Sequence, residues 1–302
     1  MKQGSSIDLL NFNILFWNIN GRWRFFRDEE IFTWTKQFNI IFLSETHFTK
    51  GQKFDLPQYK AYHNPFSDAL CRYPCGGVSA FVHDSIQEYV EHIETSHSNH
   101  IVITVKGGHR IFGSYIPPSE SIYHSEELLW DIPFFFTPKD SDRIILGGGD
   151  LNSRVGDIAS KDSWQYRNNP DTELNENGRK LKKMCQSYNI KTLNNLSAYG
   201  KNFDGDFTYN KDGRKSQVDI CLVNTSGLDA VTSFNIHHVP INFSDHTPIS
   251  VELDFEINST IPTSQVTADI LSNNGEDAGK KPPSGNQVTN KDQLGSICRY
   301  SN

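Results

Sequence analysis

Acidic, amide and imidazole side chains stand at the ends of several apolar runs in this sequence. The clearest run, Ile144-Ile145-Leu146, passes through three glycines into Asp150 and Asn152. A lone Gly-Asp-x-Asn is as often a turn or an Asx cap as a site. Four further apolar runs adjoin similar groups, which are Asn18, Glu45, Asp219 and Asp245-His246. Because buried strands of α/β sheets expose polar groups only where they end, the pattern predicts a site assembled from strand ends.

Oxygen ligands dominate this set, as a hard divalent cation such as magnesium requires. Glu45 with Asn18 suits the metal, since one or two carboxylates and an amide leave room for waters and a substrate phosphate. Asp150 and Asn152 lie two residues apart, so in an extended backbone both side chains point to one face. There they suit the activation or positioning of a water molecule.

A histidine completes the predicted site. His246 suits the stabilisation of charge that grows on phosphorus oxygens, provided that Asp219 orients its ring and favours the imidazolium. A zinc site at Cys71-x-x-x-Cys75 is not expected, because no second Cys or His pair stands at zinc-finger spacing. The five cysteines, an odd and scattered set, indicate reduced thiols rather than a disulfide framework.

The elements that must hold these groups are read from hydrophobic spacing. Strands are expected at Ile14–Ile19, Ile40–Ser44, Gly77–Val82, His100–Val105, Arg110–Ile116, Arg143–Gly148, Ile190–Leu193, Val218–Val223, Val231–His238 and Thr247–Leu253. Helices are expected at Arg27–Phe38, Ser121–Phe136 and Glu173–Tyr188. Their imperfect alternation favours mixed sheets over a purely parallel wound fold.

Composition separates a folded part from a tail. Residues 1–257 carry the apolar periodicity, and we expect them to form the catalytic domain. Residues 258–302 are rich in Ser, Thr, Asn, Pro and Gly, which predicts a disordered polar tail. The formal net charge is -7, which disfavours a phosphate polymer as partner unless bound cations or basic patches such as Arg22, Arg24 and Arg27 offset it.

Seven short motifs in one order resemble the endonuclease/exonuclease/phosphatase superfamily. They are Asn18-Ile19-Asn20-Gly21, Ser44-Glu45-Thr46-His47, Gly76-Gly77-Val78, Tyr115-Ile116-Pro117, Gly149-Asp150-Leu151-Asn152, Gln217-Val218-Asp219 and Ser244-Asp245-His246. The resemblance covers about residues 12–255. It implies a four-layer α/β sandwich of two mixed β-sheets flanked by helices.

The resemblance also implies a role for each site residue. Glu45 would be the main metal ligand, with Asn18 and Asp245 near the metal or the leaving group, and the metal would be magnesium or manganese. The catalytic residues would be Tyr115, Asp150, Asn152, Asp219 and His246. Among them, Asp150 would activate water or protonate the leaving group with Asn152 as its partner, and Tyr115 would contact the scissile phosphate.

Within the superfamily, the residues in and around these motifs are most similar to those of the apurinic-type endonuclease domains of non-LTR retrotransposons. This similarity implies DNA as the substrate. Supporting stretches are Tyr115–Ser119, Gly149–Gly156, Asn175–Leu181, and Phe207–Tyr209 before Ser216–Asp219. No Tyr-x-Asp-Asp motif occurs, so we expect no reverse transcriptase domain in this chain. Two alternatives remain: a metal-dependent phosphatase or phosphodiesterase acting on small-molecule or lipid phosphates, and a catalytically idle interaction module.

The remaining expectations concern location and assembly. Met1–Asn11 has no apolar block of the secretory type, so an intracellular protein of the nucleus or cytoplasm is expected. No apolar run approaches the roughly 18 residues of a membrane span, so no membrane partner is expected. The sequence leaves the oligomeric state open.

Overall fold

The structure is a computed structural model, and it describes residues 7–65, 75–96, 99–124, 126–136, 142–156, 169–203, 205–238 and 243–258. The predicted disordered tail, 258–302, lies outside the described residues apart from Asn258. Cys71 of the rejected zinc motif lies outside them as well.

One six-stranded sheet is built around the N-terminal strand. Its strand order is β15 (Val231–Ile236), β16 (Ile249–Asn258), β1 (Ile7–Asn18), β2 (Ile40–Ser44), β4 (Val78–His83) and β3 (Tyr59–Asn64). The pair β1–β2 is parallel and the other pairs are antiparallel, so the sheet is mixed, as predicted.

A second six-stranded sheet is built around the glycine-rich strand. Its order is β5 (Val90–Glu94), β6 (His100–Val105), β7 (His109–Tyr115), β8 (Ile145–Asp150), β14 (Asp219–Val223) and β9 (Lys191–Thr192). Only β7–β8 is parallel. Two small hairpins are separate, β10 (Ser197–Ala198) with β11 (Lys201–Asn202), and β12 (Tyr209–Lys211) with β13 (Arg214–Ser216).

The helices are α1 (Glu29–Thr35), α2 (Glu126–Phe135), α3 (Glu176–Tyr188) and α4 (Thr225–Ala230), with 3₁₀ turns η1 (Trp23–Arg27) and η2 (Asp84–Tyr89). Each predicted strand and helix overlaps an observed one, whereas β3, β5, α4 and the hairpins were not predicted. None of the helices in the described ranges has the length and apolar character needed to cross a membrane.

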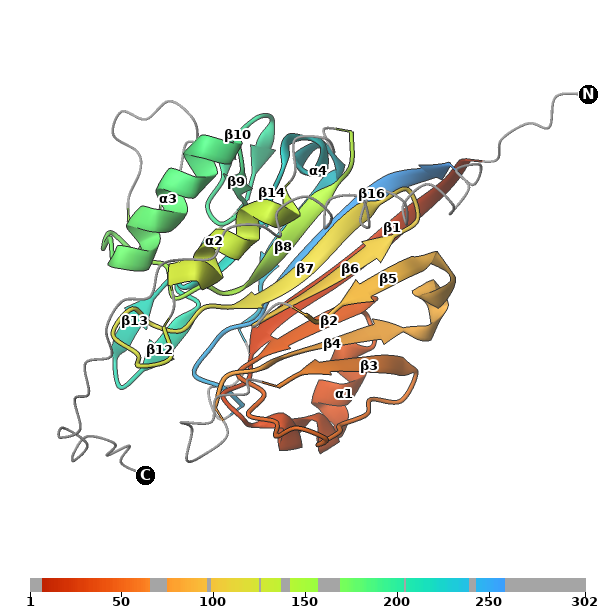
Figure 1. The fold of residues 1–302 in the computed structure, drawn as a ribbon, viewed down its shortest axis with the longest axis horizontal. Helices are drawn as coiled ribbons and strands as arrows, with labels where there is room; N and C mark the ends of the chain where they lie inside the picture. The colour runs from red at the N-terminus through yellow and green to blue at the C-terminus, as the bar shows by residue number, and fades with distance from the viewer. Residues whose placement is uncertain are drawn as a thin grey trace, which may run out of the picture. The chain divides into compact units, whose positions relative to one another are not determined.

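Figure 1 shows α2 and α3 beside the second sheet and α1 beside the first. Side chains that alternate along the strands pack these layers together. In β1, Phe16 points into the core between the two sheets, while Leu15 and Trp17 point to the outer face, which η1 and α1 cover. In the second sheet, Leu146 enters the core between the sheets, whereas Ile145 faces the outer cluster, to which α2 and α3 contribute. The predicted four-layer sandwich is therefore confirmed.

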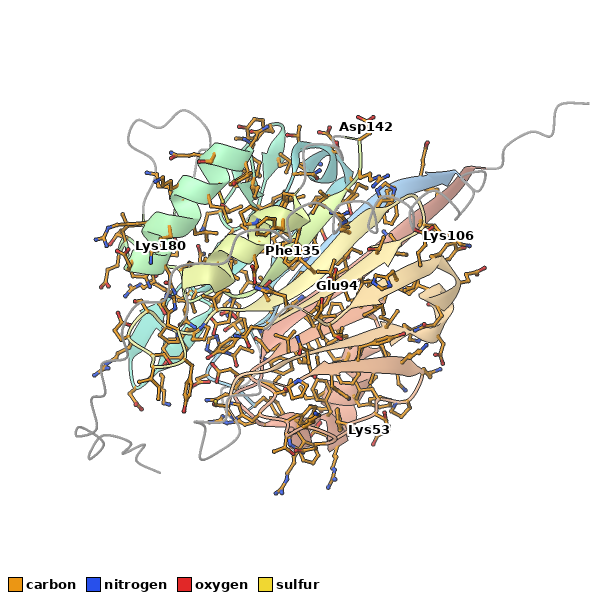
Figure 2. All side chains as sticks on the ribbon, viewed as in Figure 1. Lys53, Glu94, Lys106, Phe135, Asp142 and Lys180 are labelled. Carbon is orange, nitrogen blue, oxygen red and sulfur yellow. The ribbon has the colours of Figure 1, made fainter. Side chains whose placement is uncertain are left out.

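Two glycines make room for aromatic rings in these layers. A Cβ at Gly113 would lie 2.2 Å from the ring of Phe42, which comes from the opposite sheet. A Cβ at Gly147 would lie 2.1 Å from Phe112 on the outer face. Phe112 in turn packs on Phe135 of α2, with ring centroids 4.9 Å apart. Figure 2 labels Phe135. The glycines thus set the close packing of β7 and β8 against the neighbouring layers.

Candidate active site

Strand register brings the predicted residues to neighbouring positions at the strand ends. Asn18 pairs with Ser44 across parallel strands, which places Glu45 next to it. Tyr115 pairs with Asp150 across β7 and β8, and Asp219 pairs with Asp150 across β8 and β14. These polar residues therefore stand side by side before any side-chain contact is considered.

Asn18 links two carboxylates. Its Nδ2 donates to Glu45 Oε1 at 3.1 Å and to Asp150 Oδ2 at 2.8 Å. Its Oδ1 accepts from the backbone N–H of Asn20 at 2.9 Å. Asn18 was predicted beside the metal, and in this geometry its amide group joins the two acids while its oxygen is already bonded to the protein.

Asp150 and Asn152 form a turn rather than an extended pair. The backbone N–H of Asn152 donates to Asp150 Oδ1 at 3.0 Å, and Asn152 Nδ2 donates to Asp150 Oδ2 at 3.1 Å and to Ile116 O at 3.0 Å. Asn152 has φ +46°, so the expected extended backbone is wrong at this point. The two side chains are nevertheless in contact. They meet through an Asx turn, which was the alternative interpretation of the Gly-Asp-x-Asn sequence.

The predicted His246–Asp219 pair is present and buried. His246 Nδ1 lies 2.9 Å from Asp219 Oδ2, and its Nε2 lies 3.9 Å from Asp150 Oδ2. Trp17 Nε1 donates to His246 O at 3.0 Å, and Ser244 Oγ accepts from His246 N–H at 3.1 Å. The imidazole is thus fixed between two acids by contacts to its ring and to its backbone.

Asp245 is joined to the network through other side chains. Asn20 Nδ2 donates to both of its carboxylate oxygens, at 3.1 and 3.2 Å. Lys211 Nζ lies 3.7 Å from Asp245 Oδ2. The Asp245 side chain, predicted as a metal neighbour, is therefore neutralised in part by protein donors.

Tyr115 and His47 both lie near Glu45. Tyr115, which is 8% exposed, is close enough for the charge of the Glu45 carboxylate to act on its hydroxyl group. Burial, and then the charges of Glu45 and Asp150, raise the pKa of Tyr115 far above its usual range, so the phenol stays protonated and can donate. His47 Nε2 lies 3.4 Å from Glu45 Oε2 on the other side.

Backbone strain gathers at the same place. Asn20, Glu45, His47 and Asn152 all have positive φ, between +45° and +54°. Asparagine and histidine are enriched in this region relative to other residues, but glutamate adopts it rarely. The surrounding hydrogen bonds must hold these backbones in place, which is typical of functional sites.

The buried acids and His246 shift one another's pKa values. Burial raises the pKa of Asp150 to about 8; the charge of His246 opposes this rise, while Asp219 and Glu45 add to it. Burial would lower the pKa of His246, but the charges of Asp219 and Asp150 outweigh it and raise the pKa to about 10. Burial likewise opposes ionisation of Glu45, yet its contacts with His47, His246 and Asn18 lower its pKa overall. At neutral pH the imidazole is therefore protonated, and without a cation Asp150 also favours its protonated form.

This charge pattern fits a divalent cation on the carboxylate side of the site. One group of possible ligand atoms, from Asp150, Asp219 and His246, lies within 4.8 Å. A protonated imidazole has no free lone pair for a metal, so His246 is a poor ligand in this state. Glu45 and Asp150 offer the oxygen donors that magnesium prefers. A cation there would also favour the ionised form of Asp150, whose pKa is raised by burial and then by the charges of Asp219 and Glu45.

A threonine that had not been predicted supports the segments that carry Asp219 and His246. Thr208, fully buried, accepts the N–H groups of Val218 and Asp219 on its Oγ1 at 3.1 and 3.0 Å, and its carbonyl accepts from Thr247 N at 2.6 Å. Its hydrogen bonds therefore join the segment that carries Asp219 to the segment after His246. Phe207-Thr208-Tyr209 was noted in the sequence, but nothing there indicated this role.

Asn20 and His47 were also not predicted as site residues. Each stands two residues after a predicted one, Asn18 or Glu45, and each bonds to a site carboxylate. The same two-residue spacing that led to the prediction of Asn152 after Asp150 could have identified both Asn20 and His47.

Comparison with known proteins agrees with this geometry. The profile of the endonuclease/exonuclease/phosphatase family matches residues 15–246. A probable RNA-directed DNA polymerase from transposon BS of Drosophila melanogaster is 30% identical over 145 residues, which is 47% of this chain and 15% of that protein. The chain thus spans only a small part of the length of this curated relative.

Solved structures show the same fold. The 3′ phosphatase NExo from Neisseria, bound to a product DNA hairpin, superposes with a TM-score of 0.58 at 14% identity over 81% of this chain and 100% of that one. The endonuclease domain of TRAS1, a telomere-specific non-LTR retrotransposon, gives 0.56 at 16% identity over 81% and 98%. The AP endonuclease LMAP from Leishmania major gives 0.55 at 12% identity over 81% and 88%. With the profile match across the whole site, the chain belongs to the endonuclease/exonuclease/phosphatase family, whose members are hydrolases.

Proposed function

We propose that this protein is a divalent-metal-dependent phosphodiester hydrolase that nicks DNA. The observation that carries the proposal is a set of three carboxylates, of which Asp150 and Asp219 are buried and Glu45 is partly exposed, and one protonated imidazole, joined by Asn18 and the Asp219–His246 contact. Such a set would supply a water activator and a charged donor to one phosphate. The named substrates of the structural neighbours, and the likeness to a transposon polymerase, support DNA as the polymer.

Each residue then has a task set by its contacts. Asp150, held by Asn18 and Asn152, accepts the proton of the attacking water. His246, charged and oriented by Asp219, donates from Nε2 to a non-bridging phosphate oxygen as negative charge grows there.

Glu45 and Asp150 would hold magnesium or manganese, which when bound lowers the pKa of a ligated water and offsets phosphate charge. Tyr115, protonated at any physiological pH, donates a hydrogen bond that helps to place the scissile phosphate.

The test is nicking of supercoiled plasmid with magnesium, with manganese and with a chelator. We expect relaxed circles only when the metal is present. Glu45→Gln and His246→Asn should each lower the rate at least about 100-fold, since each removes a preorganised charge. Glu91→Gln and His92→Asn are matched controls, because both residues are exposed on β5 and should leave the rate unchanged.

A phosphatase acting on small molecules is the second candidate, and the net charge of -7 favours it. A panel of phosphomonoesters and inositol phosphates, run beside the plasmid, separates the two. Binding of DNA should weaken with salt with a log-log slope of about -0.9 per phosphate contacted, whereas hydrolysis of a small phosphate should not show such a slope. Phosphatase activity without nicking would overturn the DNA assignment. No activity on either class of substrate would favour the third reading, a catalytically idle interaction module.

A further inference from the structure

One asparagine outside the catalytic set holds the loop that carries Asn152. Asn175 precedes α3 and caps it, its Oδ1 accepting from Gly178 N–H at 2.8 Å. The same oxygen accepts from Arg154 N–H at 3.0 Å, and Asn175 Nδ2 donates to Asn152 O at 2.8 Å. The backbone N–H of Asn175 donates to Arg154 O at 3.1 Å. Helix capping alone needs only the first of these bonds.

The helix can approach this loop because residue 178 is a glycine. A Cβ there would lie 1.8 Å from Arg154 O. The first turn of α3 is therefore seated directly on the backbone that follows Asn152. We name the set Asn175, Gly178, Asn152 and Arg154 the α3 clamp.

An equivalent arrangement occurs at the other end of β8. Asn224 caps α4 through Gly227 N–H at 2.8 Å, accepts Ile145 N–H at 3.1 Å and donates to Arg143 O at 2.7 Å. Its backbone N–H donates to Ile145 O at 3.1 Å. We name the set Asn224, Gly227, Arg143 and Ile145 the α4 clamp. Both clamps use the pattern Asn-x-x-Gly and make the same four bonds to a chain segment that flanks or starts β8.

Only the α3 clamp acts on a residue of the active site. Asn152 must keep φ +46° for its side chain to reach both Asp150 and Ile116 O. A freed loop would let Asn152 turn away and leave Asp150 with fewer donors. Misplacement of a catalytic group by about 1 Å can cost about 100-fold in rate.

We propose that Asn175 is a positioning residue for hydrolysis, which fixes Asn152 and through it Asp150. The inference rests on the proposed function. Asn175 forms its bonds with the protein backbone, so its loss should lower kcat and leave KM nearly unchanged.

The experiment compares Asn175→Asp with Asn224→Asp in the full chain. Each variant retains an oxygen that can cap the helix. Each replaces the Nδ2 donor with a carboxylate oxygen, which then faces the carbonyl of Asn152 or of Arg143. Both should lower Tm by a similar amount, about 2–4 °C for the loss of roughly one hydrogen bond. We expect kcat for plasmid nicking to fall about 10- to 100-fold in Asn175→Asp and less than about threefold in Asn224→Asp. Should Asn175→Asp not fold, Asn175→Ser, which also retains a cap acceptor, takes its place.

Hydrogen exchange provides a readout that does not depend on turnover. Asn175→Asp should speed exchange in the peptide 150–156, and Asn224→Asp in the peptide 142–147. Equal losses of kcat in both variants, or a rise in KM alone, would overturn the positioning role even though the exchange pattern held. A wild-type protein that hydrolyses no phosphodiester would instead refute the proposed function itself, and the positioning role with it.

Discussion

The two ends of β8 are held by the same bonds and carry opposite kinds of residue. At its start, the α4 clamp holds Arg143 and Ile145, next to a strand that enters the core; Asp142, labelled in Figure 2, lies just before this point. At its end, the α3 clamp holds the loop that follows Asp150. Ile145 is 2% exposed and apolar, whereas Asp150 is 1% exposed and acidic.

Because the two clamps make the same hydrogen bonds, the expected effect of losing one depends on the residues that it holds. At the start of β8 the helix cap stabilises the packing, so its loss should lower the free energy of unfolding. At the end of β8 the same bonds hold the loop that follows Asp150, the residue proposed to activate water, so their loss should lower the rate of hydrolysis. Substitutions at matched positions of the two ends can separate these effects.

The largest effect is expected at the acidic end. Asp150→Asn should lower the nicking rate about 1,000-fold or more, because it removes the proton acceptor and sets an amide against donors from Asn18 and Asn152. Rates would be measured on plasmid and the fold checked by circular dichroism. An active Asp150→Asn protein would remove Asp150 from the chemistry.

At the apolar end, a substitution should lower the stability of the protein rather than its rate of hydrolysis. Ile145→Ala should lower the free energy of unfolding by about 2–5 kcal/mol, since it opens a cavity beneath the outer helices. Denaturant unfolding measures this change, and kcat of the folded fraction should stay near that of the wild type. A fall in kcat comparable to that of Asp150→Asn would show that the two ends are not separable.

Glycine substitutions compare the two clamps directly. A Cβ at Gly178 meets the Arg154 carbonyl at 1.8 Å, whereas a Cβ at Gly227 meets the Val223 side chain at 2.5 Å and the Ile145 carbonyl only at 3.2 Å. Gly178→Ala should therefore cost about 2–3 kcal/mol and Gly227→Ala about 1 kcal/mol, as overpacking is worst against backbone. Thermal unfolding of both variants tests the order, which a more damaging Gly227→Ala would contradict.

The smallest effect concerns acid sensitivity at the start of β8. His109 Nδ1 accepts from Ile144 N–H at 2.9 Å, and burial with the nearby charge of Arg143 lowers the pKa of His109 to about 4. The unfolded chain binds this proton near pH 6.5, so this stabilisation is complete above that pH and is lost as pH falls towards 4. Because the ring is partly exposed, we expect only about 1 kcal/mol.

His109→Asn keeps an acceptor near Ile144 and removes the titration. Unfolding at pH 7 and pH 4.5 should show a smaller pH difference for this variant than for the wild type, with His92→Asn on exposed β5 as the control. An unchanged pH difference would assign the acid sensitivity to other groups.

The core strands were predictable because burial on both faces leaves an apolar signature. Ile40–Ser44 was predicted to the residue, and the run into Asp150 was predicted to be a strand, as observed. Edge strand β3, with sequence YKAYHN, has one buried residue and no apolar alternation, so it gave no signal. Helix α4 has six residues, too few for helical periodicity to appear.

The sequence predicted which residues would lie together but not their geometry. Strand ends pointed to Asn18, Glu45, Asp150 and Asp245, and the resemblance added Tyr115. The orientation of Asn18, with its amide group between two acids, depends on the turn at Asn20, whose φ is +45°. Positive φ values and clamps between distant segments leave little trace in local sequence, which is why the roles of Thr208 and Asn175 emerged only from the fold.

The glycines beneath the aromatic rings have a consequence for how this sequence can diverge. Gly113 and Phe42 fill one volume from opposite sheets, as do Gly147 and Phe112 from adjacent strands. Enlarging either glycine requires a smaller partner, so neither member of a pair is free to change alone. Relatives that drift at these positions should therefore exchange bulk between partners, and a library that randomises both members together should recover folded proteins that single-site libraries miss.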